Sequence, residues 1–541
     1  MADSAVEQAL SERGAGVMRA LEIQTPDGWL RGVAGDEVAH WRGVPFAAAP
    51  VGEFRWRAPQ PVQPWQGFRE ADRFGPICAQ PRSAGLGSGA QRRTPQSEDC
   101  LTLNITAPAE PSADSLPVMV FIHGGAFVNG AGSDPAYDGS QLVRRGQVVY
   151  VSLNYRLGAL GWMHFDEYAT AQRPIESNLG LRDQLAAMEW VQRNISLFGG
   201  DPNRVTVFGE SAGAISITTL LSCPRAEGLF AGAIAQSSAP RVVPHLEQAH
   251  RWAREFLGYL VANPDDGDEV RALLEEVTPA ELSLALSRLS AAGLRDEPSA
   301  IPVVPVVDGD LVPRLPVPAI ADGEGIPVPL VIGTCDREGT LFSHFSPTHP
   351  SLKPTWKQMV TKAHSFVDQV GDPDDAEGDE TPPATQLREI YPGYPKRGAL
   401  ADLAGDGAFW YPSVEVMEAH SCHAPTFAYR YDYAPRLMNM MGVNATHGGE
   451  LLPVFGIYDN EIGRFMTALG GRGHYEGLTA TMQDQWLHFA HHQRPMDDWP
   501  PYRLEDRCTM IFDRDPRVES DPRSDRRLAW QAVTGHLPTA D

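Results

Sequence analysis

The sequence is poor in cysteine, in net positive charge and in long apolar runs. Its 541 residues include six cysteines, too few for a disulfide-built scaffold, and Cys223, Cys335, Cys422 and Cys508 show no metal-ligand spacing. Acidic residues outnumber basic ones by 69 to 45, which gives a formal net charge of -24 and disfavours nucleic acid and anionic membranes as partners. No stretch approaches the roughly 20 apolar residues of a membrane span.

The N-terminus also lacks a recognisable targeting signal. Residues 1–10 show no basic start followed by an apolar run, so we expect a cytoplasmic protein rather than a secreted one. Residues 1–17 look like an N-terminal extension, and no internal repeat or obvious linker divides the remainder. We predict one large domain over residues 18–541, with helical insertions at roughly 245–325 and 350–420.

Apolar segments of strand length alternate with segments of helical periodicity along most of the chain. In residues 181–194 and 478–491, apolar side chains recur at helical spacing. Strands that alternate with helices form mostly parallel sheets covered by helices on both faces. We therefore predict an α/β fold with strands at 101–105, 118–122, 147–153, 204–208, 232–238, 328–334, 426–431 and 508–512.

The first sixty residues depart from this alternation. Two short apolar segments, 21–25 and 29–33, flank Asp27-Gly28, and this pattern predicts a β-hairpin. Residues 41–59 are rich in aromatic residues, glycine and proline. We predict that they form an ordered loop lying across the domain.

Residues 209–213, Gly-Glu-Ser-Ala-Gly, stand between a predicted strand and a predicted helix. In this context a G-x-S-x-G motif forms a sharp turn that projects the Ser211 hydroxyl from the carboxyl end of a sheet. The glycines leave room for the turn, and the Ala212 N–H lies at a helix N-terminus, where negative charge is stabilised. Ser211 is therefore a candidate nucleophile.

A serine nucleophile needs a base and an acid that orients the base, and in such sheets both follow the serine in the chain. Glu338 and Asp336 both follow the strand that ends at Thr334, and their positions do not separate them. His447 lies in a glycine-containing loop after a late strand and is a candidate base. Other late histidines remain as alternatives, namely His420, His423, His488, His491 and His492.

The reaction also needs donors for the oxyanion of a tetrahedral intermediate. Residues 123–127, His-Gly-Gly-Ala-Phe, follow the predicted strand 118–122. Small residues in succession let backbone amides turn inward, and the segment is similar to the loop that supplies the second oxyanion donor beside such an elbow. A phosphate-binding loop is disfavoured because the continuation lacks the Lys-Ser/Thr pair.

Taken together, these residues resemble the type-B carboxylesterase family of α/β-hydrolases, which includes bacterial p-nitrobenzyl esterases and the cholinesterases. The resemblance runs from about residue 20 to 515, and Phe198–Gly213 matches the active-site signature of the family. Glu98–Ile105, with Thr106 at a position that is usually apolar, is similar to its second signature. Asn154–Gly158, Asn178–Gln184 and Trp499–Tyr502 also look familial.

The resemblance implies a role for several positions. Ser211 would be the nucleophile, Glu338 the acid in preference to Asp336, and His447 the base. The N–H groups of Gly125, Ala126 and Ala212 would form the oxyanion hole. Cys78 and Cys100 would pair as a disulfide beside the gorge, and Arg55 with Glu98 and Arg156 with Asp183 would form buried structural ion pairs.

We therefore predict an α/β-hydrolase with a mostly parallel central sheet, helices on both faces and helical insertions around a gorge. It would be a serine carboxylesterase that acts through an acyl-enzyme on a broad range of small esters or on xenobiotic ones, with no metal or organic cofactor. Its partner would be a small-molecule ester, not nucleic acid or membrane, and the chain would be a monomer or a weak homodimer. The alternatives are a catalytically inactive, cholinesterase-like binding module and a lipase that prefers long acyl chains.

Overall fold

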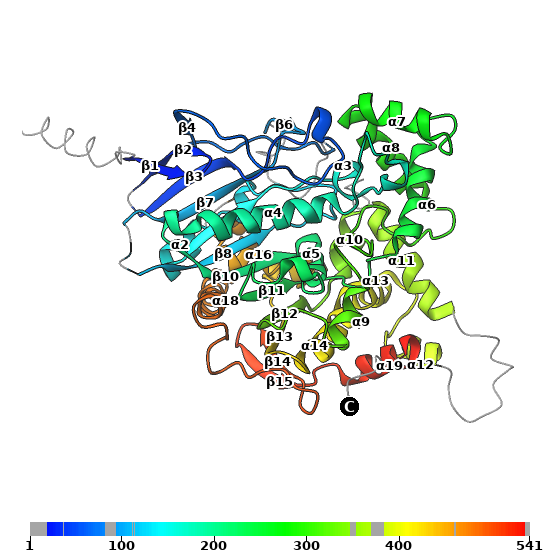
Figure 1. Cartoon of the computed structure of the whole chain (residues 1–541). Helices are drawn as coiled ribbons and strands as arrows, with labels where there is room; N and C mark the ends of the chain where they lie inside the picture. Colours follow the sequence, from blue (N-terminus) through cyan, green and yellow to red (C-terminus); the bar gives the residue numbers. More distant parts are fainter. Residues whose placement is uncertain are drawn as a thin grey trace, which may run out of the picture.

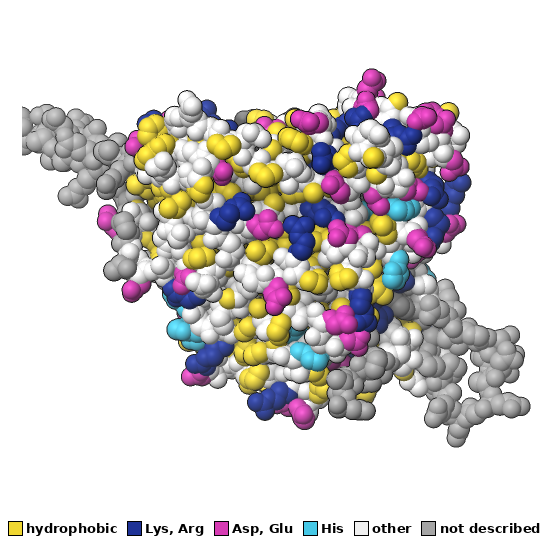
Figure 2. Space-filling view, viewed as in Figure 1, with side chains coloured by type: hydrophobic (Ala, Val, Ile, Leu, Met, Phe, Trp, Pro, Cys, Tyr) yellow, Lys and Arg dark blue, Asp and Glu magenta, His cyan; other side chains and the backbone are white. Residues whose placement is uncertain are grey.

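The computed structural model describes residues 19–35, 37–81, 94–110, 112, 114–346, 353–368, 383–458 and 461–535. The predicted N-terminal extension at 1–17 lies outside these residues, and so do residues 82–93 between Cys78 and Cys100. In the space-filling view, acidic and basic side chains are interspersed on the face shown (Figure 2). No described helix is both long and apolar enough to cross a membrane.

One large sheet forms the centre of the molecule (Figure 1). Thirteen described strands belong to it, in the order β1-β2-β3-β7-β9-β8-β10-β11-β12-β13-β14-β15, with β4 paired to β2. The run from β9 to β14 is parallel throughout, whereas β1, β2, β3 and β7 pair antiparallel at one side and β15 at the other. The predicted, mostly parallel α/β sheet is therefore confirmed.

The strands have the following bounds: β1 Arg19–Thr25, β2 Gly28–Ala34, β3 Val38–Pro45, β4 Phe68–Glu70, β5 Ile77–Cys78, β6 Gln96–Ser97, β7 Thr102–Pro108, β8 Leu116–Ile122, β9 Val149–Leu153, β10 Gly200–Glu210, β11 Gly232–Gln236, β12 Leu330–Cys335, β13 Thr426–Tyr431, β14 Cys508–Phe512 and β15 Arg517–Ser520.

The α-helices have the following bounds: α2 Ser140–Gly146, α3 Ala159–Trp162, α4 Leu179–Asn194, α5 Ala212–Leu220, α6 Leu246–Leu257, α7 Gly267–Glu276, α8 Pro279–Ala292, α9 Pro316–Ala321, α10 Gly339–Phe345, α11 Lys353–Asp368, α12 Pro383–Glu389, α13 Arg397–Gly405, α14 Tyr411–Ser421, α15 Arg436–Met440, α16 Leu451–Val454, α17 Glu461–Met466, α18 Arg472–His492 and α19 Ser524–Thr534. A single π-helical turn, Asp406–Trp410, joins α13 to α14.

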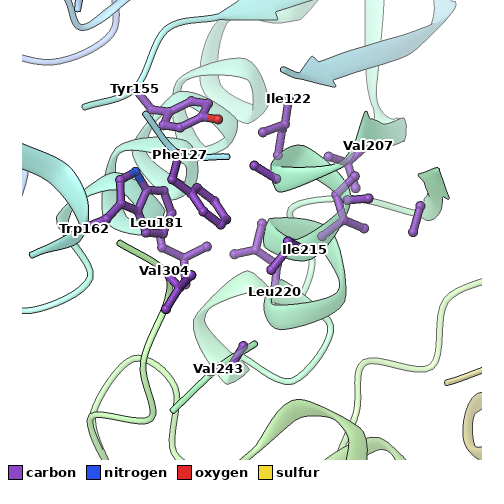
Figure 3. Packing of buried hydrophobic residues seen from close by; sticks show 14 of the residues in the cluster. Ile122, Phe127, Tyr155, Trp162, Leu181, Val207, Ile215, Leu220, Val243 and Val304 are labelled. Carbon is purple, nitrogen blue, oxygen red and sulfur yellow. The ribbon is translucent and has the colours of Figure 1, made fainter. Parts of the chain in front are cut away.

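The sheet divides the buried apolar side chains into two clusters. Successive residues of a strand point to opposite faces. In β8, Val118, Val120 and Ile122 join one cluster while Met119 and Phe121 join the other. Apolar side chains of α4 and α5 pack in the first cluster (Figure 3) and those of α18 in the second. Burial on both faces explains why the central strands are apolar throughout rather than alternating.

The N-terminal hairpin was predicted correctly, but the loop prediction that follows it is wrong at its start. β1 and β2 pair antiparallel, with Thr25 opposite Gly28. β3 then covers the start of the predicted loop 41–59, because Trp41 pairs with Ile105 of β7 and is buried in the core. An irregularity between Trp41 and Val44 accommodates Gly43 at φ +67°, so the glycine marks a bulge rather than the end of a strand.

Helices are inserted between the late strands of the sheet. Helices α6 to α9 lie between β11 and β12, and α10 to α14 lie between β12 and β13. Most of them gather beside and beyond the carboxyl ends of the strands, at the right of Figure 1. The division into one domain with insertions at 245–325 and 350–420 stays a prediction.

Candidate active site

Ser211 occupies a strained turn between β10 and α5. Its backbone has φ 57° and ψ −122°, a region that residues with a side chain rarely adopt. A Cβ on Gly209 or on Gly213 would lie 2.6 Å or 2.0 Å from the Ile122 carbonyl oxygen. The two glycines therefore let the turn pass close to β8, and the Ser211 N–H donates to the Gln236 carbonyl of β11.

Three side chains that are distant in the sequence form one hydrogen-bonded line. His447 Nε2 is 2.9 Å from Ser211 Oγ, and His447 Nδ1 is 2.6 Å from Glu338 Oε2. His447 and Glu338 are 7% and 2% exposed, so water competes little for these hydrogen bonds. The sequence alternatives do not reach this place. Asp336 instead accepts hydrogen bonds from Arg523.

The other late histidines have partners elsewhere. His420 bonds to Thr426, His423 to the Ala321 carbonyl, His488 to the Arg494 carbonyl and His491 to the Gly146 carbonyl, while His492 lies against the His488 ring. None of these contacts involves Ser211. Among the candidates named from the sequence, the structure brings together only Ser211, Glu338 and His447.

Two more glutamates are buried beside this line. Glu210 Oε1 is 3.2 Å from His447 Nε2. Glu450 Oε1 is 2.8 Å from the Ser237 hydroxyl, whose oxygen is also 2.7 Å from Glu338 Oε1. Two carboxyl groups therefore contact the imidazole, and a third lies next to Ser237, in a place from which water is largely excluded.

Burial and charge shift the pKa values of this cluster in opposing ways. Burial raises the pKa of Glu210 to about 8, against the lowering effect of His447, and it raises the pKa of Glu450. For His447, burial alone lowers the pKa, but the carboxylates of Glu210 and Glu338 outweigh it and raise the pKa to about 9. Because these groups interact strongly, they titrate as a unit.

The loop after β8 lies directly against the Ser211 turn. A Cβ on Gly124 would be 2.8 Å from Glu210 Oε2 and 3.1 Å from Ser211 Cβ. Gly125, Ala126 and Phe127 all have positive φ, which turns this segment sharply. His123 in the same loop stacks on Tyr155, and burial lowers its pKa to about 4, so it is a neutral, packed side chain.

Two aromatic rings lie against the imidazole. The Phe409 and Phe342 ring centroids are 4.5 Å and 5.3 Å from that of His447, and the two phenyl rings stack on each other. Phe409 belongs to the π-helical turn Asp406–Trp410, and such turns are frequent at functional sites. The rings restrict the tilt of His447 and make its surroundings apolar.

The two cysteines that the resemblance paired lie buried and free in this structure. The Cys100 and Cys78 thiols are in hydrogen-bonding contact, which together with burial raises the pKa of Cys100. The Leu157 N–H also donates to Cys78 Sγ. The pairing of the two cysteines as a disulfide stays a prediction. Among the described residues, no group of three or more histidine, cysteine or acidic side chains is arranged to hold a metal ion.

Reasoning from the sequence did not assign roles to Glu210, Ser237 or Glu450. Each lies next to a residue or motif that it did single out. Glu210 is the variable residue of the G-x-S-x-G motif, Ser237 follows the end of β11, and Glu450 lies three residues after His447. The only signal in the sequence was that these three residues stand close to the motif, the strand end and the histidine. Their contacts arise because neighbouring parallel strands end at the same edge of the sheet, and the sequence does not show this.

Comparison with known proteins places the chain in one family. The model of the carboxylesterase family matches residues 19–530. The para-nitrobenzyl esterase of Bacillus subtilis is 37% identical over 514 residues, which cover 93% of this chain and 97% of that protein. Carboxylesterase 1E of Mus musculus is 34% identical, with 86% and 84% covered.

Solved structures agree with this placement. A PNB esterase structure has a TM-score of 0.80 at 36% identity and covers 94% of this chain and 99% of its own. A carboxylesterase of Geobacillus stearothermophilus has a TM-score of 0.78 at 32% identity, with 94% and 100% covered. The chain therefore belongs to the carboxylesterase family of α/β-hydrolases and is a carboxylic ester hydrolase.

Proposed function

We propose that Ser211, His447 and Glu338 are the catalytic triad through which this chain cleaves esters. The observation that supports it is the hydrogen-bonded line from Ser211 Oγ through both ring nitrogens of His447 to Glu338. A serine hydroxyl becomes a nucleophile when a base accepts its proton, and a carboxylate on the far nitrogen holds the base in the required tautomer.

The proposed reaction has two halves. Ser211 Oγ forms a bond to the ester carbonyl carbon while its proton moves to His447 Nε2. The carbon–oxygen bond to the alcohol then breaks, and the alcohol leaves with the proton from Nε2. In the second half, His447 takes a proton from water as the water oxygen attacks the acyl-enzyme. The acid is released when the bond to Ser211 breaks and the proton returns to Oγ.

We propose that the N–H groups of Gly125, Ala126 and Ala212 bind the oxyanion that forms in each half. Support comes from the approach of Gly124 to Ser211 Cβ and from the start of α5 at Ala212. In addition, none of the turn, loop and cap hydrogen bonds between described residues uses these three N–H groups. Removing one such donor typically costs about 10²–10³ in rate.

The proposed substrates are small esters that reach Ser211 through a largely apolar gorge. The relatives include a para-nitrobenzyl esterase and mammalian carboxylesterases, and the rings of Phe342 and Phe409 next to His447 favour an apolar acyl or alcohol group. A lipase would prefer long chains. Comparison of butyrate with palmitate esters, with and without an oil–water interface, tests this preference.

The decisive experiment replaces the nucleophile. Ser211→Ala should abolish turnover of p-nitrophenyl acetate, a loss of at least about 10⁴-fold, while the far-ultraviolet circular dichroism remains that of the parent. Ser222→Ala is the matched control, because Ser222 is buried two residues beyond the end of α5 and its hydroxyl, among the described residues, bonds to the Thr219 carbonyl alone. A fluorophosphonate probe should label Ser211. Retained turnover in Ser211→Ala, or labelling elsewhere, would refute the proposal.

A further inference from the structure

The hydroxyl of Ser237 faces two carboxyl groups at once. Its oxygen is 2.7 Å from Glu338 Oε1 and 2.8 Å from Glu450 Oε1. A hydroxyl donates one proton and can accept a hydrogen bond from a second donor. One of the two glutamates must therefore be protonated, because two ionised carboxylates would leave one oxygen–oxygen contact without a hydrogen between its atoms.

The surroundings of the two glutamates show which one carries this proton. Glu338 accepts hydrogen bonds from the backbone N–H of Cys335 at 2.6 Å and from His447 Nδ1 at 2.6 Å, and both stabilise a carboxylate. No salt bridge among the described residues joins Glu450 to a lysine or arginine. The titratable groups that face Glu450 are Glu210, Glu338, His447, Cys335, Tyr429 and Tyr431.

The thiol of Cys335 fixes which oxygen of Glu450 is protonated. Cys335 Sγ is 2.7 Å from Glu450 Oε2. Burial raises the pKa of this thiol well above its usual range, so it stays protonated and donates its hydrogen. Because Oε2 is then the acceptor, the proton of a neutral Glu450 lies on Oε1, which faces Ser237.

We propose that Cys335 is a positioning residue for the esterase reaction, and that its thiol sets the direction of a chain of hydrogen bonds reaching the triad. In this chain the thiol donates to Glu450, the neutral Glu450 donates to Ser237, and Ser237 donates to Glu338. The proposal rests on the triad described above. Its consequence is that Glu338 is the carboxylate of the pair, and that Glu450 adds no negative charge beside His447.

That consequence matters for the base. Each carboxylate near His447 makes the imidazolium more stable, and a protonated His447 cannot accept the proton of Ser211. An ionised Glu450 would therefore move the onset of activity to higher pH. A neutral Glu450 lets the acid-side midpoint of the pH–rate profile stay at lower pH. It still supplies the hydrogen bond that reaches Glu338 through Ser237.

Glu450→Gln tests the protonation state directly. The glutamine amide can donate to Ser237 and its carbonyl can accept from the thiol, so it reproduces a neutral, directed Glu450. We expect kcat to fall less than about tenfold. The acid-side midpoint of kcat/KM against pH should stay within about 0.3 pH units of the parent value, which is less than the shift that one nearby charge causes. A fall of that midpoint by about one unit or more would show that Glu450 is ionised and would overturn the proposal.

Three variants test the thiol. Cys335→Ala should lower kcat about fivefold, the factor expected for one neutral hydrogen bond, with little change in KM, and Cys335→Ser should restore it because a hydroxyl also donates. Cys223→Ala is the matched control, since Cys223 is fully buried and the one acceptor of its thiol among the described residues is the Thr219 carbonyl. Its kcat should be unchanged. An equal loss in both alanine variants would reduce Cys335 to a packing residue.

A double-mutant comparison then tests the route. In the Glu450→Ala background the thiol has lost its acceptor, so Cys335→Ala should lower kcat no further. A full additional loss would show that Cys335 does not act through Glu450.

An infrared measurement needs no turnover and therefore separates this proposal from the proposed function. The difference spectrum between the parent protein and Glu450→Gln at neutral pH should contain the C=O band of a protonated carboxylic acid. The difference spectrum between the parent protein and Cys335→Ala should contain a hydrogen-bonded S–H band. A carboxylate band in place of the acid band would overturn the proposal even if Ser211→Ala confirmed the triad. Conversely, the acid band would stand if Ser211 proved not to be the nucleophile.

Discussion

Two buried centres of charge in this protein are built in opposite ways. Arg156 and Asp183 form a pair with side chains 3% and 0% exposed. Asp183 accepts from the Arg156 Nε, Nη2 and backbone N–H, and Nη1 donates to the Arg57 carbonyl. One cation faces one anion, so the charges balance and the bonding atoms have partners.

The centre at Ser211 is unbalanced. The carboxyl groups of Glu210, Glu338 and Glu450 cluster near His447, and among the described residues no lysine or arginine forms an ion pair with them. Burying several anions with one cation forces some of them to bind protons. The comparison teaches that charge balance makes a buried centre inert, whereas an excess of acids keeps protons within reach of the reacting atoms.

The largest effect should come from neutralising the acid of the unbalanced centre. Glu338→Gln keeps the size of the side chain but removes the charge that orients and stabilises the imidazolium, so we expect kcat to fall about 10⁴-fold. Steady-state hydrolysis of p-nitrophenyl acetate measures it. Asp336→Asn is the matched control, because Asp336 binds Arg523 instead, and it should retain most of kcat. If the two variants lost equal activity, Glu338 would have no special role.

The same change in the balanced centre should affect stability rather than chemistry. Asp183→Asn leaves Arg156 buried without its counter-charge, and breaking such a pair typically costs about 3–5 kcal/mol of unfolding free energy. Urea unfolding measures this loss, and kcat per active site, titrated with a fluorophosphonate, should stay near that of the parent. A large fall in kcat with unchanged stability would contradict the distinction between the two centres.

A smaller effect should separate the carboxyls around His447. In its ionised form Glu210 stabilises the imidazolium and helps to raise the pKa of His447 to about 9. Without that charge His447 loses its proton at lower pH, so in Glu210→Gln the acid-side midpoint of kcat/KM should move down by about one to three units. The Glu450→Gln variant provides the comparison, since its midpoint should not move. An upward shift in Glu210→Gln would reverse the sign of this argument.

The smallest effect should come from an ion pair of similar geometry at the surface. Arg145 donates from Nε and Nη2 to the two carboxylate oxygens of Asp484, both at 2.8 Å, yet these side chains are 40% and 48% exposed. Water screens the pair, so Arg145→Ala should cost less than about 1 kcal/mol. Urea unfolding of Arg145→Ala and Asp183→Asn under the same conditions measures the two losses of unfolding free energy. Equal costs would mean that burial is not what makes the Arg156 pair important.

Much of the fold could be predicted from local pattern. The apolar runs at β8, β10 and β11 and the periodicity of α4 and α18 were sufficient to predict a parallel α/β sheet, because strands buried on both faces have to be apolar throughout. The interpretation of residues 41–59 as a loop failed at β3, where Gly43 and Pro45 suggested a break. Pairing of β3 with β7 overrides that signal, since a bulge accommodates the glycine.

Less of the candidate site could be predicted in this way. Ser211 was identifiable because its turn is local, with glycines at 209 and 213 that leave no room for a Cβ. Local sequence left Glu338 and Asp336 equivalent and offered several histidines besides His447. The resemblance to a family, not spacing, favoured Glu338 and His447, and it assigned nothing to Glu450 or Cys335.

What the sequence determined by itself was therefore the alternation of strands and helices and the position of the strained serine turn, because both follow from contacts between near neighbours in the chain. Only the tertiary structure decided which acid and which histidine meet that serine. Parallel pairing of β10, β11, β12 and β13 brings their carboxyl ends to one edge of the sheet. Ser211, Glu338 and His447 follow β10, β12 and β13 in the chain and become neighbours there, although more than one hundred positions separate His447 from Glu338.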